Sequence, residues 1–263
     1  MDYSYIPISD AQLLLSVVLV IICGLISWLL QLGLLKSLLW GTVRAFVQLT
    51  VIGYALTYIF KINNLYLILL VILLMSLVAS REASRRIKKG DKTVIMSFIA
   101  LSASTFVVGI IVVRLVISPH PWYSAQVMIP IFGMLLGNSM NAIALSLDRM
   151  YAEVHSHVNQ VEQLLCLGAT PWEAARDYLR RAVEAGMLPT INSLMIVGLV
   201  SLPGMMTGQI LAGMDPREAV RYQFVVMIMI AAAVAIACLC MAGLSFRKMF
   251  TSDMGVAETL RHN

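Results

Sequence analysis

Long apolar runs constrain this chain more than any other feature of its sequence. A helix needs roughly 20 mainly apolar residues to cross a bilayer, and seven stretches come close to or exceed that length. They occupy residues 11–32, 38–60, 63–80, 93–117, 125–147, 187–212 and 222–246. Backbone groups in lipid must bond within their own segment, so such runs predict helices. We expect an all-α membrane protein, a polytopic bundle of about seven transmembrane helices forming a single domain over residues 1–263.

The placement of lysine and arginine predicts how this bundle is oriented. With seven spans, the two longest basic connections, 81–92 and 148–186, lie on the same side of the membrane as the tail. Cytoplasmic loops carry an excess of these residues, so the N-terminus is expected outside and the C-terminus in the cytoplasm. We therefore predict a multi-pass protein of the cell inner (plasma) membrane. Contact of the loops with the anionic lipid bilayer explains the net charge of +5 without a nucleic-acid partner.

Residues 148–186 are predicted to form a cytoplasmic two-helix segment with a break near its middle. Gly168 and Ala169 end the first helix, and Thr170 caps a second helix whose first turn contains Pro171. Glu162 precedes Gly168 by six positions, which resembles the coupling-loop motif of ABC transporter permeases. The two alanines of that motif are replaced here by other residues. The segment therefore predicts either a coupling site for a partner ATPase or an ordinary pair of interfacial helices.

Two predicted spans share a short pattern, in which a proline precedes Gly-Met-x-x-Gly and an amide side chain follows. Small residues at this spacing let helix backbones approach closely, and proline frees a backbone carbonyl. The pattern predicts either helix packing or a substrate path. The residues that we assign to such a path are Met134, Asn138, Asn141, Met205, Met206 and Gln209.

Arg44 and Gln48 lie one turn apart on the predicted span 38–60. An arginine inside a span is a functional candidate by default, so both residues join the hypothetical substrate path. Arg44 is also close enough to the cytoplasmic end for its side chain to extend into the headgroups.

Several chemistries have no counterpart in this sequence. It contains no GxxxxGK[ST] phosphate loop, no HExxH and no GxSxG, so we expect a chain that is not an enzyme and binds no cofactor itself. No Asp or Glu lies well inside a predicted span, and a bare ferrous ion would favour carboxylate or imidazole ligands. Which residues would bind a metal is therefore unknown from the sequence.

Three blocks of this sequence closely resemble the FetB-type permeases: residues 128–147, residues 197–223, and Arg44-Ala45 with Gln48-Leu49. The resemblance implies the membrane half of an iron-exporting ABC transporter, with ATP bound by a separate ATPase subunit and with a second permease copy. A plant branch of the family is linked to aluminium tolerance and to export of a sugar nucleotide. The export direction rests on the resemblance alone.

Two alternatives remain open. One is an ABC permease for an anionic or chelated substrate, such as a sugar nucleotide or a metal chelate, met by Arg44. The other is a carrier or channel driven by an ion gradient, although carriers of that kind typically contain intramembrane carboxylates.

Overall fold

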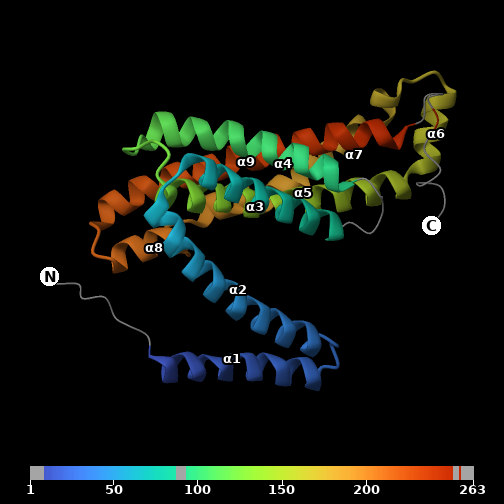
Figure 1. Cartoon of the computed structure of the whole chain (residues 1–263). Helices are drawn as coiled ribbons and strands as arrows, with labels where there is room; N and C mark the ends of the chain where they lie inside the picture. The colour runs from blue at the N-terminus through green and yellow to red at the C-terminus, as the bar shows by residue number, and fades with distance from the viewer. Residues whose placement is uncertain (1–8, 87–92, 251–254, 256–263) are drawn as a thin grey trace.

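The computed structural model describes residues 9–86, 93–250 and 255 (Figure 1). The elements are α1 Asp10–Leu29, α2 Leu35–Ile62, α3 Leu65–Arg86, α4 Thr93–Ile111, the π-helical turn η1 Val112–Ile117, α5 Ala125–Ser156, α6 Val158–Cys166, α7 Pro171–Ile196, α8 Gly204–Leu211 and α9 Pro216–Met249. Within these described ranges there is no β-strand, and an isolated bridge joins Val197 and Ser201. The prediction of an all-α, polytopic membrane protein is confirmed, because six of the helices are long and apolar enough to cross a bilayer.

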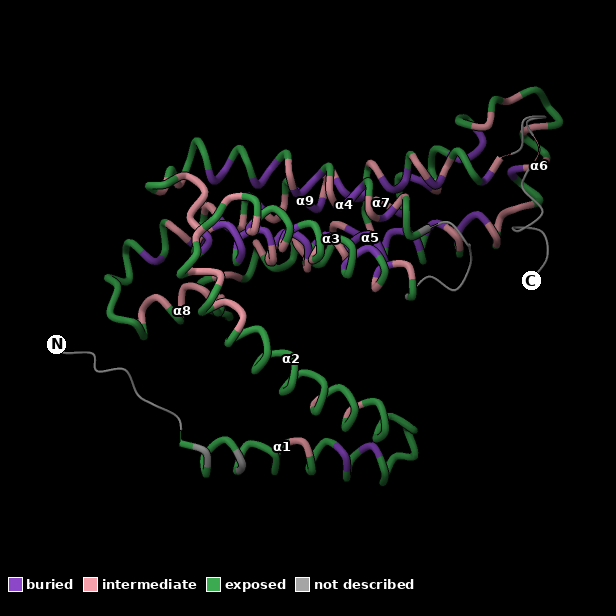
Figure 2. The backbone as a smooth tube through the Cα atoms, in the orientation of Figure 1, coloured by how far each residue is buried: buried purple, intermediate pink, exposed green. Residues whose placement is uncertain are grey.

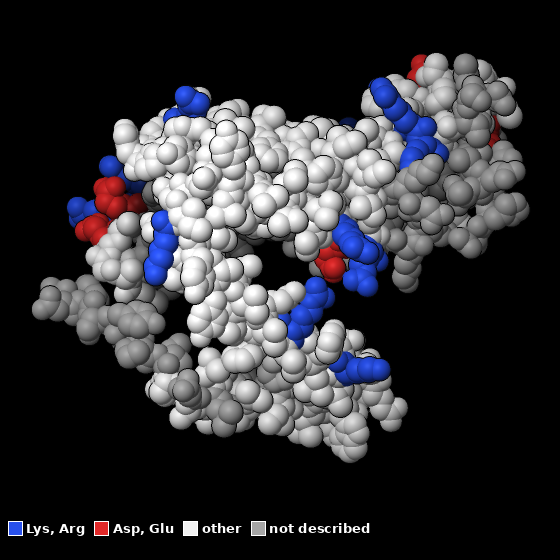
Figure 3. Space-filling view, viewed as in Figure 1, with Lys and Arg blue, Asp and Glu red and all other residues white. Residues whose placement is uncertain are grey.

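The distribution of charge on the surface agrees with a bilayer environment. On the face shown in Figure 3, Lys, Arg, Asp and Glu gather toward the ends of the helices and leave a broad uncharged surface between them. The predicted orientation also uses basic residues within 87–92 and Arg261 in the C-terminal tail, and these lie outside the described residues.

Helices α3, α4, α5, α7 and α9 form the bundle, with buried residues concentrated where they face one another (Figure 2). Two clusters make up most of its core. The α6-end cluster includes Val154, Val161 and Met249, and the α8-end cluster includes Ala125, Phe132 and Val226. Helices α5 and α9 therefore start at the same end of the bundle and finish together at the other end.

The chain must consequently return between the end of α5 and the start of α9, and α7 with α8 makes this passage. The predicted sixth span, 187–212, is wrong as a single helix. Helix α7 continues to Ile196, residues 197–203 are non-helical, and α8 follows. The break has a local cause: Gly198 adopts φ +82°, a conformation that side chains disfavour, and Pro203 lacks the N–H that a continuous helix would need. This interrupted passage lies beside the six candidate spans, and a seventh crossing of the membrane at this place stays a prediction.

The limits predicted for the 148–186 segment do not coincide with the ends of helices. Helix α5 does not end at residue 147 but runs on to Ser156, and α7 passes through residues 186 and 187 without interruption. The sequence predicts a polar helix that ends near residue 186 and an apolar helix that begins at residue 187. They are one helix, because a change in the surroundings of a helix does not require a break in its backbone.

Helices α1 and α2 form a hairpin that stands away from the bundle (Figures 1 and 2). Helix α2 has no buried residue, and only Leu56, Ile59 and Phe60 near its end pack against the α8-end cluster. Asn63, in the left-handed conformation at the end of α2, accepts a hydrogen bond from the backbone N–H of Ala125 at 3.0 Å. This contact fixes the turn between α2 and α3 to the start of α5.

Candidate functional site

A cleft of about 400 Å³ lies where α5, α7, α9 and the break at residues 197–203 meet. Its polar lining consists of two amides and three hydroxyls. These side chains are Asn138 and Asn141 from α5, Thr190 and Ser193 from α7, and Ser201 from the break. Asn138 lies about 20 Å along α5 from Ala125, where this candidate membrane span begins. A hydrocarbon core about 30 Å thick that starts at Ala125 would therefore contain the cleft.

The break that lines this cleft satisfies its backbone groups locally. The N–H of Gly198 donates to the carbonyl of Ser201 at 2.9 Å, and the N–H of Val200 donates to Ile196 at 3.0 Å. At the start of α8, the N–H of Thr207 donates to the carbonyl of Pro203 at 3.0 Å. Non-helical backbone at membrane depth is tolerated where it is covered by protein or lines a cavity, and this segment does line one.

Pro189 lies inside α7 and lines the cleft together with Thr190 and Ser193 of the same helix. Proline cannot donate a backbone hydrogen bond, so it frees a carbonyl in the preceding turn. Ser193 uses the carbonyl of Pro189 itself, to which its hydroxyl donates at 2.9 Å. The α7 wall of the cleft thus carries polar groups, although the residues of α7 around it are mainly apolar.

The predicted path residues do not all meet at this cleft. Asn138 and Asn141 line it, and the side-chain amide of Asn138 also donates to the carbonyl of Met134 at 2.8 Å. Met134 and Met205 instead pack, half-buried, against the α8-end cluster. The methionine that does line the cleft is Met227 of α9, which the sequence pattern did not single out.

The other predicted path residues lie on α8 and α2. Met206 and Gln209 are half-buried on α8, and the side-chain oxygen of Gln209 is buried with no hydrogen-bond partner among the described residues. Arg44 and Gln48 are exposed on α2, which has no buried residue and stands away from the bundle, and neither residue lines the cleft. A joint path through all these residues stays a prediction.

No charged side chain lines the cleft among the residues that the structure describes. Within the same residues, no three His, Cys, Asp or Glu side chains are grouped closely enough to hold a metal ion. The cleft offers amides, hydroxyls and one thioether, which suit a ligand bound by hydrogen bonds or weak coordination.

The predicted elbow between α6 and α7 is present. Gly168 adopts φ +91° just after α6, and Ala169 is half-buried beside it. Thr170 caps α7: its hydroxyl accepts from the N–H of Glu173 at 3.3 Å, and its own N–H donates to the Glu173 carboxylate at 2.8 Å. Hydrogen bonds from the backbone and then the side chain of Thr170 hold the pKa of the Glu173 carboxyl below its ordinary value. Pro171 begins the helix as predicted.

The tip of the elbow is apolar and exposed. Leu167 is 85% exposed and Leu164 is 42% exposed, beside the half-buried Glu162 of the predicted coupling motif. An exposed apolar surface of this kind suits contact with another protein or with a membrane.

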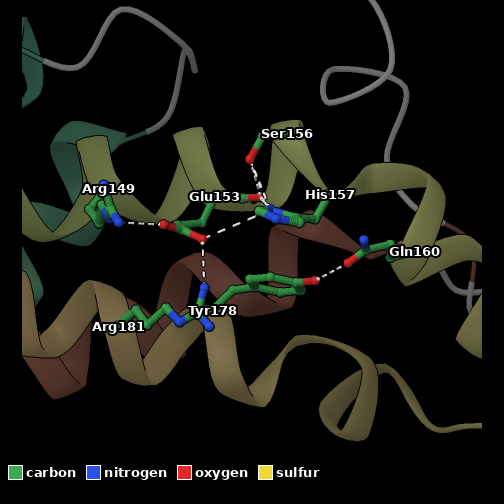
Figure 4. Close-up of polar contacts among 7 residues, drawn as sticks. All are labelled: Arg149, Glu153, Ser156, His157, Gln160, Tyr178 and Arg181. Atoms are coloured by element: carbon green, nitrogen blue, oxygen red, sulfur yellow. Dashed lines mark hydrogen bonds and ion pairs between the residues drawn. The ribbon is translucent and has the colours of Figure 1, made fainter.

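A buried carboxylate connects this region to the bundle, and sequence reasoning missed it. Glu153 of α5 has a side chain only 9% exposed and lies 2.6 Å from Arg149 and 3.3 Å from Arg181 of α7 (Figure 4). His157 Nδ1 is 3.9 Å from the same carboxylate. The i,i+4 spacing of Arg149 and Glu153 was visible in the sequence. The α7 partner is fixed only by the tertiary fold.

Aromatic contacts extend this arrangement to α6. The ring of Tyr178 on α7 stacks on His157 with centroids 5.1 Å apart, and its hydroxyl donates to Gln160 of α6 at 3.3 Å. Helices α5, α6 and α7 are thus held together as one unit next to the elbow.

Comparison with known proteins identifies relatives over most of the chain. It is 37% identical to the probable iron export permease protein FetB of Escherichia coli, over 93% of each chain. A UPF0014 membrane protein of Synechocystis is 40% identical over 78% of this chain and 79% of its own. The protein ALUMINUM SENSITIVE 3 of Arabidopsis thaliana is 34% identical over 81% of this chain and 77% of its own. No solved structure matches the chain.

The match to a family extends over almost the whole described fold, from the start of α1 to the residue after α9. Residues 10–250 match the family described as Uncharacterised protein family (UPF0014). The chain is therefore a membrane protein that belongs to the UPF0014 family.

Proposed function

We propose that this chain is the permease subunit of an ABC-type exporter, which moves iron or another metal out of the cytoplasm. A separate ATPase subunit binds and hydrolyses ATP, and the permease itself is neither an enzyme nor a cofactor-binding protein. The observation that carries the proposal is the continuity of α7, which joins the exposed elbow to the membrane cleft as one helix.

The relatives support this proposal. The Escherichia coli protein bears the name of a probable iron export permease, and the similarity to it covers 93% of both chains. The elbow residues Gly168, Thr170 and Pro171 and the cleft residues Asn138 and Asn141 all fall inside the family match.

The elbow has the properties expected of a contact for the ATPase. Its backbone is fixed by the Thr170 cap, its tip exposes Leu167, and the ion pairs of Glu153 fasten it to α5. A rigid contact of this kind transmits movement of a partner instead of absorbing it. In this assembly two permease copies face two ATPase copies, and the elbow lies in the cytoplasm with the C-terminus, while the N-terminus is outside.

The chemistry of the cleft favours one alternative substrate class. Because the described lining has neither carboxylate nor imidazole, a bare divalent cation would lose much of its hydration without strong ligands in return. A chelated metal or a sugar nucleotide would instead present groups that amides and hydroxyls recognise. The same permease architecture would then serve an anionic or chelated substrate.

The decisive experiment compares sealed vesicles that contain the permease alone with vesicles that contain the permease and its ATPase. We expect ATP-dependent iron transport only when both subunits are present. Transport by the purified permease without ATP would overturn the ABC assignment in favour of an ion-gradient-driven carrier or a channel. Transport of a chelate but not of free iron would keep the ABC assignment and change the substrate.

Replacement of cleft residues tests the site within this assay. The pair Asn138→Ala and Asn141→Ala should reduce transport severalfold while the complex still assembles, because it removes both amides from the lining. Asn159→Ala on the exposed surface of α6 is the matched control. Joint replacement of Met134, Met205 and Asn138 by leucine tests the wider path, and unchanged metal efflux would exclude it.

A further inference from the structure

A second hollow lies between α7 and α9 and shares no lining residue with the cleft. This groove has a volume of about 510 Å³. Its apolar walls are Leu179, Val183, Met187 and Ile191 of α7 with Leu239 and Ala242 of α9. Gly243 contributes to its width, because a Cβ added there would have no heavy atom within 4 Å. The apolar walls suit an acyl chain.

One end of the groove is basic and aromatic. Arg176 and Arg180 lie one helical turn apart and both line it. Arg180 forms no ion pair with any described residue, and Arg176 has only a 3.9 Å contact with the exposed Asp177. Trp172 lies at the same end and is packed edge-on against Phe246, with ring centroids 5.8 Å apart. Guanidinium groups recognise phosphate, and tryptophan is enriched at membrane interfaces.

The length of the groove matches one leaflet of a bilayer. From Arg180 to Ile191 the rise along α7 is about 16 Å, and half of a hydrocarbon core is about 15 Å. With the two arginines at the level of the headgroups, an acyl chain in the groove would reach the middle of the bilayer.

We propose that this groove binds one anionic glycerophospholipid. Its phosphate lies between Arg176 and Arg180, and one acyl chain follows the apolar wall of α7 toward Ile191. Glu184 also lines the groove, one turn deeper than Arg180, and it offsets part of the positive charge. The proposal therefore predicts opposite effects of neutralising the arginines and neutralising this glutamate.

The test uses the full-length protein, purified in detergent and incubated with vesicles of phosphatidylglycerol or of phosphatidylcholine. Retained lipid is then counted by native mass spectrometry. The wild-type chain should retain one phosphatidylglycerol and little phosphatidylcholine. The double variant Arg176→Gln, Arg180→Gln should weaken retention on the order of tenfold, because each basic residue near an anionic headgroup contributes a severalfold effect. Glu184→Gln should strengthen it.

Matched controls separate the groove from general effects of charge and size. Arg217→Gln with Arg221→Gln removes two exposed arginines at the opposite end of α9 and should leave retention unchanged. Gly243→Leu should fill the groove and displace the lipid. Gly53→Leu on exposed α2, where a Cβ also meets no heavy atom within 4 Å, should not.

Four results would overturn the proposal. The first is equal retention of the two lipids, and the second is equal loss in the groove variants and their controls. The third is a lipid-free particle with two copies of the chain, which separates into single chains when Arg176 and Arg180 are replaced. Inorganic phosphate should not displace the bound lipid, since it fills only the headgroup end. The fourth result is displacement by phosphate, which would show that the apolar wall adds nothing.

Discussion

Gly186 is a point of close approach between α7 and its neighbours α5 and α9. A Cβ added there would lie 2.8 Å from the backbone oxygen of Ala142, 2.8 Å from Cys238 Sγ and 2.9 Å from Ser146 Cβ. Because the first of these atoms belongs to the backbone, no side-chain rotation relieves the overlap. We expect Gly186→Ala to destabilise the fold by about 1–3 kcal/mol, the usual cost of overpacking a core.

Thermal unfolding of the detergent-solubilised protein measures this cost. Gly137→Ala is the matched control, since Gly137 lies inside α5 and a Cβ there meets nothing within 4 Å. The control should unfold at or slightly above the wild-type temperature, because alanine has a higher helix propensity than glycine. Equal unfolding temperatures for the two variants would contradict the close contact at Gly186.

Glu153 is expected to govern stability next to the elbow. Glu153→Gln keeps the size of the side chain but removes the charge shared by Arg149 and Arg181. A hydrogen bond to a charged group contributes about 1.5–3 kcal/mol, and exposure of both arginines places the expected loss near the lower value. Unfolding by denaturant would measure it. Arg149→Gln combined with Glu153→Gln should lose less than the sum of the two single variants.

At this scale the sequence predicted local chemistry well and remote partners poorly. The left-handed glycine at 168 and the Thr170 cap followed from the residues next to them. The pairing of Glu153 with Arg181 and the position of Met227 in the cleft depend on how helices distant in sequence are packed. No spacing within a single helix contains that information.

Among the helices, the break at residues 197–203 is the element on which the cleft depends. Replacing Gly198 and Pro203 together by alanine removes the positive φ and restores a backbone donor, so both changes favour a continuous helix. We expect this double variant to insert and assemble normally but to lose transport, because the wall formed by the break would be lost.

The matched control for this variant is Pro130→Ala. Pro130 lies inside α5, which is continuous through it, and it is exposed and does not line the cleft. The control should transport at near the wild-type rate. A fully active Gly198→Ala, Pro203→Ala double variant would show that the break is not needed for the function that we propose.

Most helices could be predicted because their apolar runs have clear ends. The exception is informative: residues 197–203 are nearly as apolar as the helices around them. Hydropathy reports the surroundings of a segment and not its backbone conformation. Gly198 and the pair Pro203-Gly204 indicated a break, but similar residues elsewhere, such as Pro130 and Gly137, lie within a continuous helix.

For the whole molecule, the interrupted passage decides which side of the membrane each end occupies. Seven passages place the two ends on opposite sides, whereas six would place them together. Cysteines introduced at Asn64 and Ala212, with the native ones replaced, should react with an impermeant maleimide on intact spheroplasts. In a separate variant that keeps Cys166 and lacks the other cysteines, this residue beside the elbow should react only after permeabilisation. Reaction of Cys166 from outside, or of Ala212→Cys only from inside, would contradict the proposed orientation.

The arrangement of α1 and α2 beside the bundle could not be predicted from the sequence. Their apolar runs resemble those of α3 and α4, yet α2 has no buried residue while α4 packs against α3 and α9. Hydropathy does not distinguish a surface covered by lipid from one covered by protein, because both are apolar.

The tight contact at Gly186 has a mechanical consequence for the uninterrupted α7. The helix is held there between α5 and α9, and nearer its start the ion pair of Arg181 with Glu153 fastens it to α5. A sideways push at Pro171 would therefore displace α5 and α7 together as one body. Because both helices line the cleft, the displacement would reach it without being absorbed between them.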